Sequence, residues 1–212
     1  MTPERSPGRL AEDDRGWIRE HWFGGAGSLH ARPMPADGRR RLSLLEVRRP
    51  AIVLGSTSTE PSAASWDSRT VDVVRRRSGG GLVWLDPVNS TWIDVFVPRT
   101  DPLHQADVGR AFLWLGNRLA AAARRAGLDA RVHNGPYRPG PDRGLVCFEG
   151  LGAGEVVVGA QKLIGISQRR TRAGSRFQCV WYRRWELGAL SAVLDSTVSA
   201  RAATAGVGTD EL

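Results

Sequence analysis

Hydrophobic and polar residues alternate along several short segments of the chain, and a period of two predicts β-strands. The clearest segment is Thr91–Val97, in which Ile93, Val95 and Val97 share one face. The other segments that we expect to be strands are Arg41–Arg48, Ala51–Gly55, Val71–Val74, Leu82–Leu85, Ala130–His133, Leu145–Phe148, Glu155–Val158, Lys162–Ser167 and Phe177–Trp181.

One long segment has the period of an α-helix. Asp101 and Pro102 are expected to supply its N-cap and first turn, and Gly127 its end. Glu186–Leu194 is expected to form a second helix. Many short strands without regular strand–helix alternation predict an α+β fold with a mixed sheet. The apolar positions that repeat at helical spacing in the long segment are Val108, Phe112, Leu115, Leu119, Ala122 and Ala126.

A chain of 212 residues suits one domain with a full core. Residues 1–16 are polar and rich in proline and glycine, so we expect a flexible N-terminal segment, and residues 195–212 are expected to form a flexible, alanine-rich tail. The folded domain is then 17–194. We see neither a membrane span nor a secretory signal, and two cysteines do not make a disulfide scaffold. We therefore expect a cytoplasmic protein without a membrane partner.

The net charge of +8 raises the question of a nucleic-acid partner. Of the 30 basic residues only Lys162 is a lysine, which indicates a composition in which arginine replaces lysine on the solvated surface. The arginines do not interleave with aromatic residues in one stripe, so we expect no nucleic-acid partner. A lysine retained in such a chain indicates a position that needs a compact cation rather than a planar one.

The most distinctive short motif is RRRSGGG, residues 75–81, between two expected strands. Three consecutive glycines cost conformational entropy, and bare backbone can approach an anion and direct N–H groups at it. The motif is not a P-loop, because no Gly-Lys-Ser/Thr and no helix follow. The motif predicts an anion-binding loop, and the alternative is a flexible hairpin turn.

The segment around Lys162 is the second distinctive motif. Strand alternation places Lys162 with Ile164 and Ile166 on an apolar face, where a buried ammonium needs an anionic partner. The alternative is a lysine that extends outward at a sheet edge.

Other candidate sites are weaker. Residues 150–154 imitate a dinucleotide fingerprint, but Glu155 stands at the third glycine position and a strand follows, so we expect a hairpin turn. The four histidines have no metal-ligand spacing with Cys147 or Cys179, so we expect no metal site in the protein itself. The apolar neighbours of Cys147 are typical of a core cysteine, with a nucleophile as the alternative.

The two motifs together resemble the lipoate–protein ligase A family of the biotin/lipoate ligase superfamily. The match to the glycine loop consists of Arg75, Arg76, Ser78, Gly79, Gly80 and Gly81, and the match to the lysine strand of Lys162, Leu163, Gly165, Ser167 and Arg169. The similarity runs from about residue 42 to 190. It implies a largely antiparallel sheet flanked by helices, with residues 17–194 as a single catalytic acyl-transfer domain.

The resemblance implies that the protein attaches a lipoyl or octanoyl group to a lysine of a lipoyl carrier domain through an acyl-adenylate, using ATP and Mg. The carrier would be a dehydrogenase E2 subunit or the glycine cleavage H protein. Lys162 would be catalytic, polarising the acyl carbonyl. The implied substrate-binding residues are Arg75, Arg76, Ser78, Gly79, Gly80, Gly81, Gly165 and Arg169.

The chain departs from the family pattern at Leu85, Val88 and Gly135, on the side that would bind the nucleotide. The departures leave an ATP-independent alternative without cofactors, an octanoyltransferase that takes its acyl group from acyl carrier protein through a Cys147 thioester. A catalytically dead acyl-binding homologue is a further alternative. The glycine loop is not of the biotin ligase type.

Overall fold

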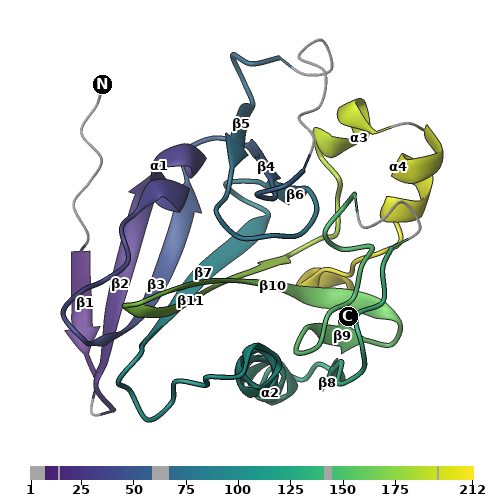
Figure 1. Ribbon diagram of the computed structural model, residues 1–212. Helices are drawn as coiled ribbons and strands as arrows, with labels where there is room; N and C mark the ends of the chain where they lie inside the picture. Colours follow the sequence, from purple (N-terminus) through teal and green to yellow (C-terminus); the bar gives the residue numbers. More distant parts are fainter. Residues whose placement is uncertain (1–7, 14, 59–66, 141–144, 195) are drawn as a thin grey trace.

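The computed structural model describes residues 8–13, 15–58, 67–140, 145–194 and 196–212. Within them, eight strands form one large sheet in the order β1-β2-β3-β7-β11-β10-β9-β8 (Figure 1). All neighbouring strands are antiparallel except β2 and β3, which confirms the mixed, largely antiparallel sheet. The strands are β1 (Gly8–Glu12), β2 (Trp17–Gly24), β3 (Arg40–Val47), β7 (Ser90–Pro98), β8 (Ala130–Val132), β9 (Val156–Val158), β10 (Gln161–Thr171) and β11 (Gly174–Tyr182).

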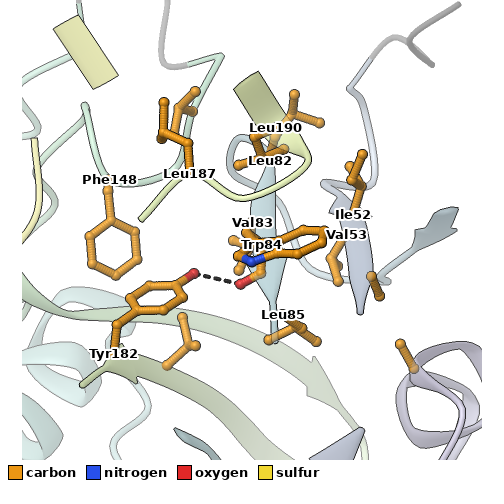
Figure 2. Packing of buried hydrophobic residues seen from close by; sticks show 14 of the residues in the cluster. Ile52, Val53, Leu82, Val83, Trp84, Leu85, Phe148, Tyr182, Leu187 and Leu190 are labelled. Carbon is orange, nitrogen blue, oxygen red and sulfur yellow. Dashed lines mark hydrogen bonds between the residues drawn. The ribbon is translucent and has the colours of Figure 1, made fainter. Parts of the chain in front are cut away.

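A smaller sheet has the order β5-β4-β6 and consists of β4 (Ala51–Leu54), β5 (Asp72–Arg75) and β6 (Val83–Leu85). Side chains of β4 and β6 share a hydrophobic cluster with Tyr182 of the large sheet. Figure 2 shows this packing, in which the Tyr182 hydroxyl donates a hydrogen bond of 2.6 Å to the backbone oxygen of Trp84. This contact fixes β6 against β11.

The large sheet has an apolar core on each face because its central strands alternate. On β7, Trp92 packs in the cluster with the small sheet, whereas Val95 packs in the cluster with helix α2 (Val108–Arg125). On β11, Tyr182 packs in the cluster with the small sheet and Phe177 in the cluster with helix α2. The small sheet and the long helix therefore cover opposite faces of the large sheet, as Figure 1 shows.

The predicted strands are observed with ends within one residue, except that β10 and β11 are longer than expected and Leu145–Phe148 is not a strand. In that segment only Val146 forms a β-bridge, which is parallel and joins it to Leu82. The predicted hairpin between 145–148 and 155–158 is therefore wrong. Strand β9 pairs instead with β8 and β10.

The predicted start of the long helix is also wrong. Asp107 is the N-cap, and its carboxylate accepts a hydrogen bond of 2.7 Å from the Arg110 backbone N–H. The Asp101 carboxylate instead pairs with Arg40 and accepts from the Leu103 backbone N–H, so it stabilises a turn before the helix. The predicted end is confirmed, since Gly127 follows the helix with a left-handed φ of 95°.

The two ends of the chain contain regular structure that the sequence did not predict. β1 lies in the segment 1–16, and helix α4 (Ser196–Ala202) and a 3₁₀ helix (Thr209–Glu211) lie in 195–212. Of the predicted helix Glu186–Leu194, only α3 (Leu190–Val193) forms, because Gly188 has a left-handed φ of 52°. The remaining helix is α1 (Ala26–Ala31). None of the helices in the described ranges combines the length and apolar character that crossing a bilayer requires.

Candidate functional site

The glycine loop is held by the arginine that precedes it. The Arg76 side chain is buried and donates hydrogen bonds of 2.8 Å to the Gly79 oxygen and 3.0 Å to the Gly81 oxygen. Arg76, which the sequence predicted to bind a substrate anion, therefore also shapes the loop. The guanidinium thus joins two carbonyls of the loop and restrains a segment rich in glycine.

The loop also packs closely against the end of β4. A Cβ atom at Gly55 would lie 1.8 Å from the Gly80 backbone oxygen, so only glycine fits there. Arg75 donates 2.9 Å and 2.6 Å hydrogen bonds to the backbone oxygens of Gly55 and Ser58. Gly80 itself has a positive φ of 102°. Arg75 therefore ties the loop to the small sheet.

Ser78 joins the glycine loop to the large sheet. Its hydroxyl lies 3.0 Å from the Ser167 hydroxyl of β10 and donates a 3.1 Å hydrogen bond to the Gln178 side-chain oxygen of β11. The two motifs that the sequence singled out are thus brought together.

Lys162 is buried, with a side chain only 2% exposed. Its Nζ lies 2.8 Å from Glu155 Oε2, donates a 2.6 Å hydrogen bond to the Cys147 backbone oxygen, and lies 5.4 Å from the centre of the Phe148 ring. The predicted anionic partner therefore exists and is Glu155. A β-bulge next to Lys162 interrupts the predicted alternation with Ile164.

Glu155 is the main residue at this site that sequence reasoning missed. Besides the lysine, its carboxylate accepts backbone hydrogen bonds from Gly152 at 2.7 Å and Ile166 at 3.3 Å. In the sequence, Glu155 is distinctive only as the residue that interrupts a glycine pattern. An acidic residue leading into a fully apolar strand was the available signal.

The backbone of Lys162 is fixed from a distant part of the chain. Its N–H donates to the Ala205 oxygen, and its own oxygen accepts from the Val207 N–H, both at 3.1 Å. The Gln161 side chain donates a 2.9 Å hydrogen bond to the Gly206 oxygen. The segment after α4 therefore adds a short parallel pairing to the start of β10.

Two pockets meet at this site. One is mostly apolar and lies between the small and large sheets. The other is bordered by the glycine loop, Lys162 and Glu155. Cys147, Ile166 and Ser167 line both pockets, so the two spaces adjoin at these residues. The chain thus provides an apolar chamber beside one that contains the Lys162–Glu155 ion pair.

The two cysteines differ in their environments. Cys147 is half-buried and lies where the pockets adjoin, and its sulfur would be 3.9 Å from a Cβ placed on Gly80. Cys179 is fully buried in the core, and burial raises the pKa of its thiol far above the usual range. Only Cys147 is both accessible and next to Lys162.

Gly165 and Arg169 occupy different surroundings. A Cβ at Gly165 would be 3.2 Å from the Phe148 ring, so glycine lets this ring pack on β10. Arg169 Nη1 is buried, and no hydrogen-bond partner for it is found among the described residues. Burial and nearby Arg77 lower the Arg169 pKa. Arg75 and Arg169 are outside the sets of residues that line the two pockets.

His30 of α1 is a second residue that the sequence analysis did not single out. It lines the apolar pocket, with its ring 4.3 Å from the Trp92 ring. Burial, followed by the charge of nearby Arg76, lowers the His30 pKa to about 3, so the ring is neutral at physiological pH. In the sequence, His30 is one of four histidines spread along the chain, and no pattern indicated a role for it.

The fold, with a glycine loop next to a buried lysine strand, is that of solved lipoate–protein ligase structures. The chain belongs to the lipoyl protein ligase A/B catalytic domain family, whose model matches residues 30–210. The resemblance found in the sequence is thereby confirmed, and the protein is a member of this enzyme family. No curated protein matches the chain in sequence.

Solved structures with this fold include lipoate–protein ligase A bound with ATP, at 19% identity and a TM-score of 0.62 over 82% of this chain and 66% of that one. This chain spans about two thirds of the length of that ligase. A putative lipoate protein ligase from T. acidophilum with bound lipoic acid has 20% identity and a TM-score of 0.64, over 88% and 74% of the two chains. A bi-partite lipoate protein ligase and its E2 lipoyl domain from Thermoplasma acidophilum has 17% identity and a TM-score of 0.63, over 89% of this chain and 72% of that one.

Proposed function

We propose that this protein transfers a lipoyl or octanoyl group to a lysine of a lipoyl carrier domain. The observation that carries the proposal is the apolar pocket that adjoins, at Cys147, a second pocket with Lys162 and Glu155 in its lining. The hydrocarbon chain occupies the apolar pocket, and the carboxyl end lies in the second pocket, near Lys162. Family membership and the lipoic acid and E2 lipoyl domain of the similar structures support this assignment.

Lys162 provides a compact positive charge beside the reacting carbonyl. Its ammonium is fixed by Glu155 and by the Cys147 backbone oxygen, so little reorganisation is needed when negative charge develops on the acyl oxygen. The backbone of the glycine loop borders the same pocket. An arginine would place a wide planar guanidinium where the compact Lys162 ammonium now contacts Glu155 and the Phe148 ring.

Of the two routes open to this family, the geometry favours a thioester on Cys147. The Cys147 thiolate attacks the carbonyl carbon of an acyl thioester on acyl carrier protein, the bond to the carrier sulfur breaks, and that sulfur leaves and takes up a proton. The amine of the acceptor lysine then attacks the Cys147 thioester, an amide forms, and the Cys147 thiol is restored. The position of Cys147 between the two pockets supports this route.

The charged groups around Lys162 also support the thioester route. A magnesium ion prefers carboxylate ligands, but Glu155 is the only carboxylate among the residues that line this pocket. This carboxylate is already paired with Lys162, so a magnesium ion at this pocket would have to be held mainly by the phosphates of a nucleotide.

The acyl-adenylate route is the second candidate, and two observations favour it. The similar ligase is bound with ATP. Arg169 lies near Arg77, which belongs to the glycine loop. One guanidinium nitrogen of Arg169 is buried, and the described residues supply no hydrogen-bond partner for it. Such a group suits a phosphate oxygen.

One experiment separates the routes. The protein is incubated with a lipoyl domain and either octanoyl acyl carrier protein without ATP, or octanoate with ATP and Mg²⁺, and the intact masses of both proteins are followed. We expect acylation of the lipoyl domain from the acyl carrier protein and an octanoyl adduct on the enzyme. Cys147→Ala should lose both, while the matched variant Cys179→Ala should keep the adduct. Acylation only with ATP, unchanged in Cys147→Ala, would establish the ligase route, and acylation under neither condition would refute the proposed function.

A further inference from the structure

The apolar pocket extends across three neighbouring strands of the large sheet. Its lining includes Gly165 on β10, Val180 on β11 and Trp92 on β7, which are paired in register. Cys147 lies at the β10 side, where its backbone oxygen accepts from Lys162, and His30 packs with a tilted ring against Trp92 at the β7 side. Two strand spacings, roughly 9–10 Å, separate these sides. That span is similar to the length of a medium acyl chain, so His30 lies near the end of the chain remote from the carboxyl group.

The hydrogen bonds around His30 determine which ring nitrogen carries the proton. The Gln178 side-chain oxygen accepts from the Ser78 hydroxyl, so its amide nitrogen is the atom 3.1 Å from His30 Nδ1. An amide nitrogen can only donate, so Nδ1 accepts and the proton of the neutral ring is on Nε2.

The Nε2–H group is thus a donor held in a mostly apolar pocket. Nε2 is buried, and the described residues provide no hydrogen-bond partner for it. A buried donor without an acceptor is costly, and the cost is relieved when a ligand supplies an acceptor at that point. A plain alkyl chain has none. The dithiolane ring of a lipoyl group has two sulfur atoms, and divalent sulfur is a weak acceptor.

We propose that His30 makes the apolar pocket selective for an acyl chain that ends in a sulfur-containing ring, so that lipoyl groups are preferred over octanoyl groups. The proposal rests on the proposed acyl-transfer function and names the substrate within it. The Ser78–Gln178–His30 chain of hydrogen bonds connects the glycine loop to this residue, so His30 is held in the required tautomer by the same elements that shape the site.

The test measures the binding of free acids by calorimetry, which does not depend on turnover. The probes are lipoate, octanoate and 5-cyclopentylpentanoate, which has the ring and chain of lipoate without its sulfur atoms. We expect the wild-type protein to bind lipoate more tightly than the carbocyclic acid, by roughly tenfold. His30→Leu should reduce this ratio to about one, whereas the matched variant His21→Leu, on strand β2 and outside both pockets, should keep it.

Equal binding of lipoate and the carbocyclic acid by the wild type would overturn the proposal, and this comparison needs no variant to fold. A ratio unchanged in His30→Leu would also overturn it. Transfer assays with lipoyl and octanoyl donors distinguish the two levels of inference. Equal transfer of both groups refutes the selectivity alone, whereas no transfer and no binding of any acid refutes the proposed function as well.

Discussion

The ion pair between Lys162 and Glu155 allows a quantitative prediction about stability. Both side chains are almost fully buried, at 2% and 7% exposed. Truncation of Glu155 leaves an ammonium without its counter-charge and also removes the acceptor of two backbone N–H groups, those of Gly152 and Ile166. Removing one partner of a buried pair costs about 3–5 kcal/mol, so Glu155→Ala should lower the free energy of unfolding by at least about 3 kcal/mol.

Urea unfolding followed by tryptophan fluorescence measures this loss, provided that the transition is two-state. The double variant Glu155→Gln with Lys162→Met should recover much of the stability, because it removes the charge and keeps an acceptor for the backbone. The exposed pair Arg131–Asp129, at 74% and 72%, is the control, and Asp129→Ala should change stability by less than about 1 kcal/mol. A loss below about 1 kcal/mol for Glu155→Ala would mean that solvent reaches the pair and that the site is not closed.

Three further predictions concern single residues. Lys162→Arg should lose more than about 90% of the acylation rate, since the planar guanidinium does not fit; a variant that keeps a tenth of the rate or more contradicts this reasoning. Gly55→Ala should destabilise the protein and disturb the glycine loop, because its Cβ would lie 1.8 Å from the Gly80 oxygen, and unchanged thermal unfolding would disprove the close approach. The His30 pKa falls from 6.5 to about 3 on folding, so below pH 6.5 the unfolded chain binds a proton that the folded protein does not. The free energy of unfolding should therefore decline as the pH falls below 6.5, by up to about 1.4 kcal/mol per pH unit. Urea titrations from pH 7 to 4 should show a shallower decline for His30→Leu than for the wild type, and identical slopes would contradict the buried neutral ring.

The sequence predicted the parts of the site that are local in the chain. Strand alternation located most of the sheet, and the glycine loop and the lysine strand were each recognisable within a few residues. Glu155 was not assigned, because its role depends on the pairing of β9 with β10 and on a β-bulge beside Lys162. No local pattern encodes that geometry.

The error at 145–148 has a related cause. Four apolar residues before a glycine-rich turn are compatible with a strand, but here Val146 bridges to Leu82, which is far away in sequence. The resulting turn carries Cys147 to the boundary of the two pockets. His30 was missed for the same reason, since its partners Trp92 and Gln178 come from two distant strands.

The pairing of Lys162 with the segment 205–207 has a consequence for how the site forms during folding. β10 and β11 are adjacent in the chain and can pair locally, whereas the backbone N–H and oxygen of Lys162 find their partners in residues far along the sequence. The start of the lysine strand is therefore completed only when the C-terminal segment has folded back onto the large sheet. Changes in residues 205–207 can thus reach the site through the backbone of β10 without touching a pocket.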